Sequence, residues 1–316
     1  MSIDVDRVSN SGVVAPRGDQ APAEGDKELY QGRCQAAESP LVSRRVFGPC
    51  FVIDNFARVG RFLYNPGAEP ASANQISMRV SIFVTCLVDQ FFPNVGVSMV
   101  QVLRRLGIPV EVPRRQTCCG QPLFNTGYRS EARTVAARFL DVFQDCDYIV
   151  APSGSCTAMV RNFYPELFAK DEAQLRRVQA LGGKLYEFSE FLVRVLGRED
   201  VGARFPSKVT YHDACHLLRE LGIREEPRRL LAKVGGLEFV EADSANVCCG
   251  FGGTFSVKFP EISAHMVEDK ITGILRSGAE AVVANDSSCL MQIAGALRRR
   301  NLPVRTMHLA ELLACQ

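Results

Sequence analysis

Short apolar runs alternate with longer amphipathic stretches from residue 78 to the end of the chain. Apolar runs bounded by turn residues are typical of buried strands. This pattern predicts strands over 79–85, 108–112 and 147–151, and again over 208–212, 237–241 and 281–284. Because the strands alternate with helical patterns, we expect crossover connections and mainly parallel sheets.

The helical periodicity is clearest in one stretch, residues 260–276, in which an apolar face is formed by Ile262, Met266, Val267, Ile271, Ile274 and Leu275. Apolar residues that recur every three to four positions fall on one side of a helix. The same reasoning predicts helices over about 97–106, 129–144 and 225–234.

The order of these elements occurs twice along the chain. Each half also ends in a similar short segment, YEFSEFL at 186–192 and MHLAELL at 307–313. A repeated order of elements is the mark of an internal duplication. We therefore predict an α/β fold of two duplicated domains, 78–203 and 204–316.

Residues 1–77 have a different character. The first forty are rich in Ser, Gly, Ala, Pro and Asp, with few apolar residues and no period, which predicts disorder. The character changes at Met78, which is followed by a strong buried-strand pattern. We hypothesise that Met78 is the natural start and that residues 1–77 are an over-called upstream segment or an optional tail.

The composition is that of an ordinary globular protein, 47% hydrophobic and 23% charged. With 37 basic and 35 acidic residues the net charge is +2, which gives no electrostatic case for binding nucleic acid or anionic membranes. No stretch approaches the roughly 18 uncharged apolar residues of a membrane span.

Cysteine is unusually frequent, with twelve residues in a chain that has no tryptophan. The start, MSIDVDRVSNSG, is polar and acidic and does not resemble a secretory signal. Cysteine-rich chains without such a signal are typical of the reducing cytoplasm, where thiols bind metals or react more often than they cross-link. We therefore expect a cytoplasmic protein.

Eight of the cysteines occupy matching places in the two halves. In each half one follows the first strand, a vicinal pair precedes a glycine, and one follows a later strand. They are Cys86, Cys118, Cys119 and Cys156, matched by Cys215, Cys248, Cys249 and Cys289. Because the carboxyl ends of parallel strands face one crevice, we expect four thiolates to meet in each half.

Four converging thiolates favour a metal centre. Soft thiolates select iron–sulfur clusters, zinc or copper(I), and a four-cysteine set fits either a four-iron cluster or zinc. The glycine after each vicinal pair permits close approach of the backbone. Cys156 and Cys289 are predicted at helix N-termini, where the dipole lowers thiol pKa and stabilises an anionic cluster.

The other four cysteines are interpreted as small buried residues of the structure, namely Cys34, Cys50, Cys146 (in the helical stretch before Asp147) and Cys315. Gly252 and Gly253 are interpreted as permitting a turn, since no phosphate-loop lysine follows them. The basic run 298–300 is interpreted as a solvated helix end.

Two histidines, His212 and His216, flank Cys215. Either of them could be a ligand or donate a hydrogen bond to cluster sulfur. The favoured interpretation is a polar residue at a strand end. His265 and His308 are interpreted as helix-surface and helix-start residues.

The cysteine pattern resembles a known family, the CCG cysteine-rich domain. That domain occurs in heterodisulfide reductase and in iron–sulfur subunits of enzymes that oxidise glycolate and glycerol 3-phosphate. The segments VSIFVTCLVDQFFPNVG, TCCGQPLFNTGY, APSGSCTAMVR and CCGFGGTFSVK resemble the lactate utilization A branch of the family. The resemblance covers 78–313 and leaves 1–77 unmatched.

This resemblance implies an iron–sulfur electron-transfer subunit of a three-part system that oxidises L-lactate to pyruvate. Its partners would be a ferredoxin-like iron–sulfur subunit and a third small subunit. The eight matched cysteines would be ligands of one or two clusters of the 4Fe-4S type. The sequence shows no flavin or nicotinamide fingerprint, and His212 is only a candidate for a catalytic base.

The chain departs from the heterodisulfide reductase branch, which adds a fifth cysteine three residues from the last one. Here these positions are Ser153 and Met159 in the first half, and Asp286 and Gln292 in the second. The non-cubane cluster of that branch is therefore not expected. In the lactate branch a cysteine can stand in place of Ser287, so zinc or no metal in one half stays open.

Three alternative functions remain at this stage. The chain could be the iron–sulfur subunit of another 2-hydroxy-acid oxidase, such as a glycolate oxidase. It could be a redox catalyst acting on disulfides, as in heterodisulfide reductase. It could also be a zinc-stabilised scaffold without enzymatic activity, which would be colourless because zinc is redox-inert.

Overall fold

The computed structural model describes residues 78–316. The predictions made for residues 1–77, including those for Cys34, Cys50 and a start at Met78, lie outside or at the edge of this range. Among the helices of residues 78–316, none combines the length and apolarity needed to cross a membrane.

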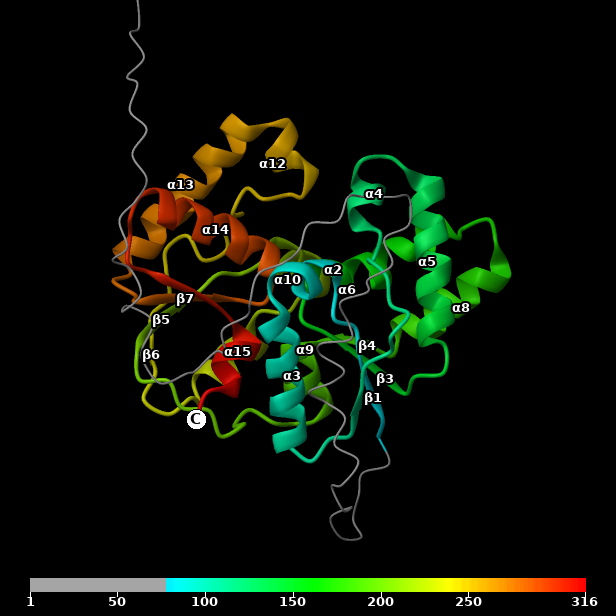
Figure 1. The fold of residues 1–316 in the computed structure, drawn as a ribbon, viewed down its shortest axis with the longest axis horizontal. Coiled ribbons are helices and arrows are strands. Elements are labelled where there is room, and N and C mark those ends of the chain that lie inside the picture. The colour runs from blue at the N-terminus through cyan, green and yellow to red at the C-terminus, as the bar shows by residue number, and fades with distance from the viewer. Residues whose placement is uncertain (1–77) are drawn as a thin grey trace, which may run out of the picture. The chain divides into compact units, whose positions relative to one another are not determined.

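Two four-stranded parallel sheets form the framework, one in each half (Figure 1). The first contains β1 (Val80–Ile82), β2 (Val110–Glu111), β3 (Tyr148–Ala151) and β4 (Leu185–Glu187) in the order β2-β1-β3-β4. The second contains β5 (Lys208–Tyr211), β6 (Glu238–Phe239), β7 (Ala281–Ala284) and β8 (Arg305–His308) in the matching order β6-β5-β7-β8. The duplicated α/β fold is confirmed, while the boundary at 203/204 stays a prediction.

The helices of the two halves correspond in part, since within residues 78–316 the first half has eight and the second six. The first half contains α2 (Cys86–Phe91), α3 (Pro93–Arg105), α4 (Gln121–Asn125), α5 (Arg129–Phe143), α6 (Gly154–Ala158), α7 (Tyr164–Leu167), α8 (Glu172–Gly182) and α9 (Phe188–Glu190), with π-helical turns at Met159–Phe163 and Phe191–Val195. The second contains α10 (Cys215–Leu221), α11 (Glu225–Leu231), α12 (Thr254–Lys258), α13 (Pro260–Arg276), α14 (Ser287–Arg299) and α15 (Leu309–Ala314).

The predicted elements are present, with shifted ends. Helix α13 has the predicted bounds, whereas the helix expected from residue 97 already begins at Pro93, a residue suited to the first helical turn. The strand expected over 79–85 ends at Ile82. Thr85 has a φ of 69°, which an extended strand does not allow, and helix α2 follows directly.

Two predictions about side chains were wrong. Ile262 is 54% exposed, although Val267, Ile271 and Ile274 of the same helix are buried. The first turn of α13 contacts α12, a short helix with no buried residue, so it has no core to face. Cys146 lies in the turn after α5 and not in a helix, but it is buried as expected.

The fourth strand of each sheet was not predicted. Strand β4 and strand β8 lie at the two similar segments that end the halves. Each is followed directly by a short helix that begins with a reciprocal cap, Glu187 with Glu190 in α9 and His308 with Glu311 in α15. The similarity of the two segments is therefore a similarity of structure.

The core has three parts separated by the two sheets. Val80 and Ile82 face a core that both halves share, whereas Phe83 faces the outer core of the first half. In the second sheet Val283 faces the shared core and Val282 the outer core. Successive strand residues thus pack alternately into the shared core and an outer core, as expected for sheets covered on both faces.

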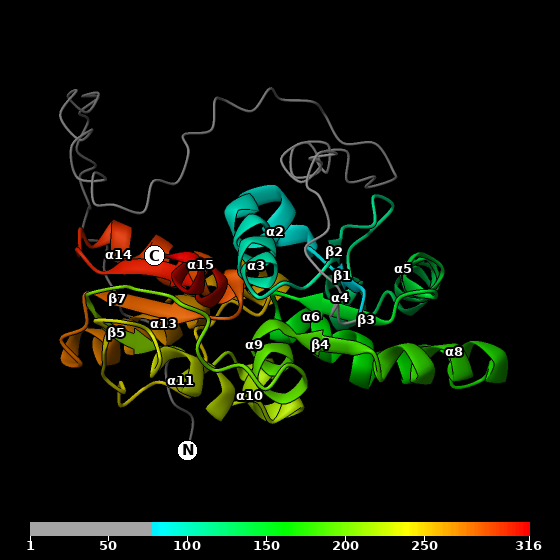
Figure 2. The same ribbon diagram turned by 90° about the horizontal axis from the view of Figure 1, so that it is seen from below.

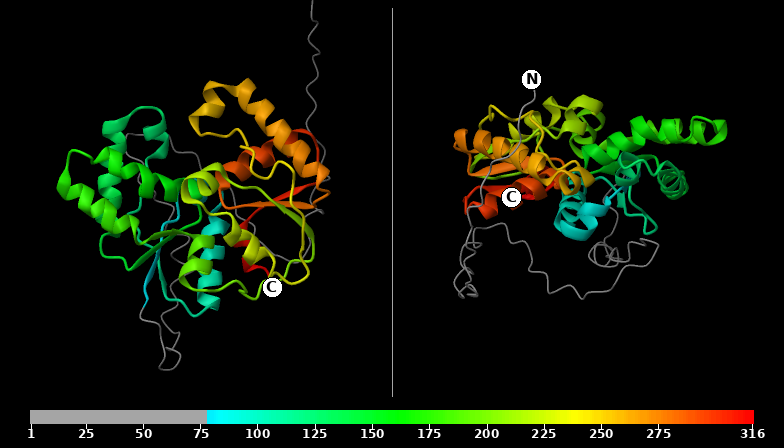
Figure 3. Two further views of the ribbon diagram at one scale, coloured as in Figure 1. Left: turned by 180° about the vertical axis from the view of Figure 1, so that it is seen from behind. Right: turned by 90° about the horizontal axis from the view of Figure 1, so that it is seen from above.

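The two halves contact each other through matched pairs of helices. Helix α3 packs against α15 and helix α11 against α9, and likewise α6 packs against α10 and α2 against α14. Figure 2 shows α3 beside α15 at the junction, and the views in Figure 3 show α5 and α8 on the opposite side of the molecule from α13. Helix α3 corresponds to α11 and α9 to α15, so the first two contacts are equivalent, and the same holds for the other two. An approximate two-fold axis relates halves that contact each other in this way.

Arg105 at the end of α3 reinforces this junction. Its guanidinium donates to the backbone oxygens of Val201 and Leu313 at 2.9 and 3.0 Å and to that of Ala314 at 2.7 Å. Hydrogen bonds from a charged donor contribute about 1.5–3 kcal/mol each when partly buried. The end of α3 in the first half is therefore tied to the end of α15 in the second and to the segment that links the halves.

We predict that Gly154→Ala destabilises the protein at the α6–α10 contact. A Cβ at residue 154 would lie 2.6 Å from the Leu217 Cβ and 2.9 Å from the Leu217 Cα, so one helix must move. Overpacking of this kind costs about 1–3 kcal/mol. Urea unfolding followed by circular dichroism measures the loss.

The matched control is Gly295→Ala in the interior of α14. There the nearest atom to an added Cβ is the mobile Arg299 Nη1 at 3.6 Å. This variant should be as stable as the parent or gain up to about 1 kcal/mol from helix propensity. Equal stabilities of the two variants would contradict the close packing of α6 on α10.

Candidate metal centres

The first candidate centre lies at the carboxyl ends of β1 and β3. Cys86 begins α2, Cys118 and Cys119 occupy the loop before α4, and Cys156 is in the first turn of α6. The Sγ atoms of Cys86 and Cys118 are 3.5 Å apart, as are those of Cys119 and Cys156. The structure thus brings the four predicted residues of the first half together.

Gln116 holds the cysteine loop beside β1. Its buried side chain accepts from the Val84 backbone N at 3.0 Å and donates to the Ile82 backbone oxygen at 2.6 Å. The amide therefore replaces strand hydrogen bonds just where β1 ends. Sequence reasoning missed this residue, because a lone glutamine carries no local signal.

The thiols of the first centre share protons. The Cys119 and Cys86 thiols donate to the Cys118 sulfur and lower the pKa of Cys118 to about 3. The same hydrogen bonds raise the pKa values of Cys86 and Cys119. One thiolate supported by neighbouring S–H groups is a donor set that releases protons when a metal binds.

The second candidate centre has the same plan. Cys215 begins α10, Cys248 and Cys249 lie in the loop before α12, and Cys289 is in the first turn of α14. The Cys215 and Cys249 thiols donate to the Cys248 sulfur and lower its pKa to about 2. The predicted residues of the second half are thus also brought together.

Glycine is required after each vicinal pair. Gly120 and Gly250 have φ values of 81° and 83°, in the left-handed region, and their N–H groups each donate to the sulfur of the first cysteine at 3.4 Å. A Cβ at Gly250 would lie 2.7 Å from the Ser263 backbone oxygen. The glycine therefore allows the loop to turn its own amide toward the cysteine sulfur.

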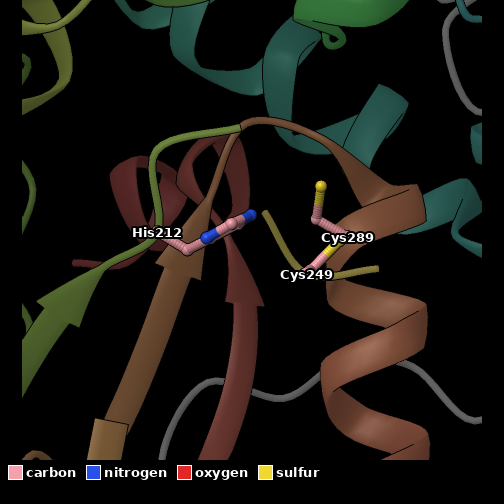
Figure 4. Close-up of side chains that lie close together, drawn as sticks. All are labelled: His212, Cys249 and Cys289. Carbon is pink, nitrogen blue, oxygen red and sulfur yellow. The ribbon is translucent and has the colours of Figure 1, made fainter. Parts of the chain in front are cut away.

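His212 belongs to the second centre. One ring nitrogen and the Sγ atoms of Cys249 and Cys289 all lie within 4.8 Å of one another, and all three residues are buried (Figure 4). Among residues 78–316 neither ring nitrogen has a hydrogen-bond partner of normal geometry. Burial, with help from the Lys270 charge, lowers the pKa of His212 to about 3, so the ring is neutral.

Of the remaining histidines, two lie as predicted, whereas His216 lies in helix α10 and not at a strand end. His265 is exposed on α13, and His308 caps α15. His216 contacts Glu220 at 2.9 Å across one turn of α10. Of the four histidines, only His212 is placed among two of the predicted ligands.

Lys270 is a functional candidate that the sequence analysis missed. This lysine of α13 is 1% exposed, and its Nζ donates to the backbone oxygens of Ser244 and Ala245, in the loop that leads to Cys248. Burial lowers the pKa of Lys270 to about 8. The available signal was a charged residue on the apolar face of the predicted helix, between Val267 and Ile274.

A single buried carboxylate joins the two centres. Asp286 accepts from the Oγ atoms of Ser153 and Ser155 at 2.7 and 2.8 Å. Ser153 in turn accepts from the Cys156 N at 3.2 Å, while the Cys289 N donates to the Asp286 backbone oxygen at 3.0 Å. The first turns that carry Cys156 and Cys289 are thereby fixed relative to each other.

A second buried contact crosses the same junction. The His308 Nε2 lies 2.9 Å from the Pro152 backbone oxygen, and its Nδ1 accepts from the Ala310 N at 3.1 Å. The Asn285 side chain donates to the Glu187 carboxylate at 2.9 Å. The contacts of His308 with Pro152 and of Asn285 with Glu187 each join residues of different halves. Buried polar contacts of this kind favour one arrangement of the halves.

The donor sets fit a metal group with soft ligands. None of the ten cysteines within residues 78–316 forms a disulfide. In each half the sulfurs share protons that a metal would displace, and in the second half a buried imidazole lacks a partner. Iron–sulfur clusters and zinc both suit this chemistry. The role of the eight cysteines as ligands stays a prediction.

The comparison with known proteins supports the resemblance. The family model described as a cysteine-rich domain (CCG) matches residues 80–161 and 209–294. The chain is 49% identical over 237 residues to lactate utilization protein A 1 of Bacillus mycoides, covering 75% of this chain and 96% of that protein. The chain belongs to the lactate utilization protein A family. Another member, from Bacillus subtilis, is 49% identical over 236 residues, covering 75% of this chain and 99% of the relative.

A solved structure shares the fold. A hypothetical protein from Helicobacter pylori aligns with a TM-score of 0.53 at 11% identity, over 84% of this chain. The alignment spans 54% of that protein. At this identity the likeness concerns the fold alone, and it agrees with the arrangement of the two sheets.

We predict that His308 makes the protein less stable in acid. Burial lowers the pKa of His308 to about 4, below the value of about 6.5 for an unfolded histidine. As the pH falls from 6.5 to 4, the unfolded state binds a proton that the folded state does not. Stability therefore falls by up to about 1.4 kcal/mol per pH unit, about 3 kcal/mol in all.

The test compares the parent with His308→Asn by urea unfolding at pH 7 and pH 4. The stability advantage of the parent should shrink by about 3 kcal/mol over this range. Gly295→Ala, which adds and removes no titratable group, should keep a constant difference from the parent. A pH-independent difference for His308→Asn would show that this histidine is not held neutral.

Proposed function

We propose that this chain is the iron–sulfur electron-transfer subunit of a multi-protein system that oxidises L-lactate to pyruvate. The observation that carries the proposal is the meeting of four cysteine sulfurs at the strand ends of each half. The relatives named lactate utilization protein A give the substrate. No catalytic base for lactate is assigned to this chain.

The residues that would hold the clusters are those listed from the sequence: Cys86, Cys118, Cys119 and Cys156, with Cys215, Cys248, Cys249 and Cys289. An iron–sulfur cluster, when bound, accepts and donates single electrons at a potential set by its surroundings. A 4Fe-4S cluster in each half agrees with four sulfurs per centre.

The protein makes each centre accessible from one side only. Cys119, Cys156, Cys249 and Cys289 are buried, whereas Cys86, Cys118, Cys215 and Cys248 are partly exposed. The buried pairs exclude water from one side, and the partly exposed pairs leave a side toward which another protein could bind. This arrangement suits a subunit that exchanges electrons with partners. We propose a ferredoxin-like iron–sulfur subunit and a third small subunit for that role.

One observation favours a second candidate for the second half only. A histidine nitrogen beside Cys249 and Cys289 is a donor set that zinc also uses. Zinc there would stabilise the fold, and only the first centre would transfer electrons.

The cluster proposal predicts metal contents. Anaerobically purified full-length chain should contain iron with an equal amount of acid-labile sulfide. Cys118→Ser and Cys248→Ser should each lose the metal of one half, about half of the total if both halves hold the same cluster. Cys146→Ser, a buried cysteine outside both centres, is the matched control and should keep all of it.

The outcome separates the two candidates. Iron lost only in Cys118→Ser, with zinc lost in Cys248→Ser, would assign zinc to the second half. Zinc without iron in the parent protein would remove the electron-transfer function while leaving the fold unchanged.

The substrate proposal predicts a growth phenotype. Deletion of the gene should abolish growth on L-lactate and leave growth on pyruvate normal, because only the oxidation step is lost. The deletion strain complemented with Cys118→Ser should behave like the deletion, and complementation with Cys146→Ser should restore growth. Normal growth of the deletion strain on L-lactate would refute the assignment to lactate.

A further inference from the structure

The two centres are built on the same plan but differ in the residues behind the cysteines. In the first sheet the Phe83 N donates to the Val150 backbone oxygen at 2.9 Å. In the second sheet the His212 N donates to the Val283 backbone oxygen at 2.8 Å. The two residues therefore occupy the same place, immediately after the first strand and three residues before its cysteine. One half has a phenyl ring here and the other an imidazole.

The helix behind each centre shows a second difference. A Cβ at Gly120 would contact the Ala132 backbone oxygen, and a Cβ at Gly250 would contact that of Ser263, which aligns α5 with α13. In this alignment Phe139 of the first half corresponds to Lys270 of the second.

The paired positions thus hold different chemistry. Phe83 packs edge-on against Phe139, with ring centroids 4.8 Å apart. In the second half these places hold His212 and Lys270, both buried. Two apolar side chains therefore lie behind the first centre, and two polar ones lie behind the second.

His212 lacks what a buried polar side chain needs. Neither ring nitrogen of His212 makes a hydrogen bond within ordinary distance and angle limits in residues 78–316. The backbone oxygen of Ala245 is close enough to the ring to affect its pKa, but this oxygen already accepts from Lys270 Nζ at 3.1 Å and from the Asp213 N at 3.0 Å. Burying an unpartnered polar group is unfavourable, and phenylalanine fills the same position in the first half without this cost. Packing alone therefore does not explain a histidine here.

The position of the ring identifies the missing partner. One ring nitrogen points toward Cys249 and Cys289, and lies within 4.8 Å of both sulfurs (Figure 4). Neutral imidazole is a common metal ligand, and it joins thiolates in both zinc and iron–sulfur sites. We propose that His212 supplies a nitrogen ligand to the metal centre of the second half. The two halves then hold centres with different donor sets, sulfur in the first and mixed sulfur and nitrogen in the second.

This inference rests on the proposed metal-binding function, and it predicts which of the two centres has the higher reduction potential. A zinc ion or four-iron cluster takes four protein ligands, so a centre that uses His212, Cys249 and Cys289 has room for one of Cys215 and Cys248, and not for both. A neutral imidazole then replaces an anionic thiolate and makes the centre less negative, and histidine ligation raises the potential of iron–sulfur centres. The buried Lys270 ammonium acts in the same sense. The second centre is therefore the one that is easier to reduce, and electrons shared between the halves would rest there.

The test uses the small number of histidines. The chain has four, so the full-length protein can be labelled selectively with ¹⁵N-histidine. If iron occupies the second half, pulsed EPR of the reduced protein should show a nitrogen coupling that changes between ¹⁴N- and ¹⁵N-histidine. If zinc occupies it, X-ray absorption at the zinc edge should show nitrogen together with sulfur.

Matched variants assign the nitrogen. His212→Asn should lose the histidine coupling and at least tenfold in the metal affinity of the second half, whereas His216→Asn and His265→Asn should keep both. His212→Phe introduces the residue that the first half carries at this place, so the core can remain packed. His212→Cys should keep metal but show no histidine nitrogen.

The outcomes are distinct. Metal in the second half without a histidine nitrogen, or an unchanged spectrum in His212→Phe, overturns this inference and leaves the proposed function standing. A chain that binds neither iron nor zinc overturns both. Should every His212 variant fail to fold, the isotope effect in the parent, retained in His216→Asn and His265→Asn, still decides.

Discussion

The first strand of each sheet is a central strand, and this strand order determines where the cysteines meet. Strand β1 pairs with β2 on one side and with β3 on the other, so the connections that leave β1 and β3 diverge. A gap opens at the strand ends where the order reverses. Cys86 and Cys156 follow these two strands, and the loop with Cys118 and Cys119 closes the gap. Every contact between sulfurs depends on that strand order, and the second half repeats it.

The sequence contained enough information for the plan of the fold and for the cysteine centres. The alternation of apolar runs and amphipathic stretches, together with a repeated cysteine spacing, reflects local structure and needs no partner from elsewhere in the chain. Strands β4 and β8 were missed because each runs directly into a helix, α9 or α15, with no turn residue to separate a strand pattern from a helical one. Asp286, Gln116 and the burial of His212 could not be predicted, because each acts through residues that are distant in the sequence.

Duplication allows the two centres to differ in their surroundings. The backbone is nearly the same around both, down to the left-handed Gly120 and Gly250. Two of the differences, Phe83 against His212 and Phe139 against Lys270, are in side chains and leave the strand register unchanged. A fold that fixes the cysteines through its backbone can thus vary the electrostatics of a centre without moving its ligands.

The matched contacts at the junction have a consequence for the origin of the molecule. Helix α3 on α15 and helix α11 on α9 are the two equivalent halves of an isologous interface, the kind that joins the protomers of a symmetric homodimer. The chain has the geometry of such a dimer with a covalent link between its protomers. A solitary repeat would leave exposed the part of the shared core that now packs against residues of the other half, such as Leu309 and Leu312. Self-association would cover that surface, and a covalent link between the copies lets each carry its own substitutions.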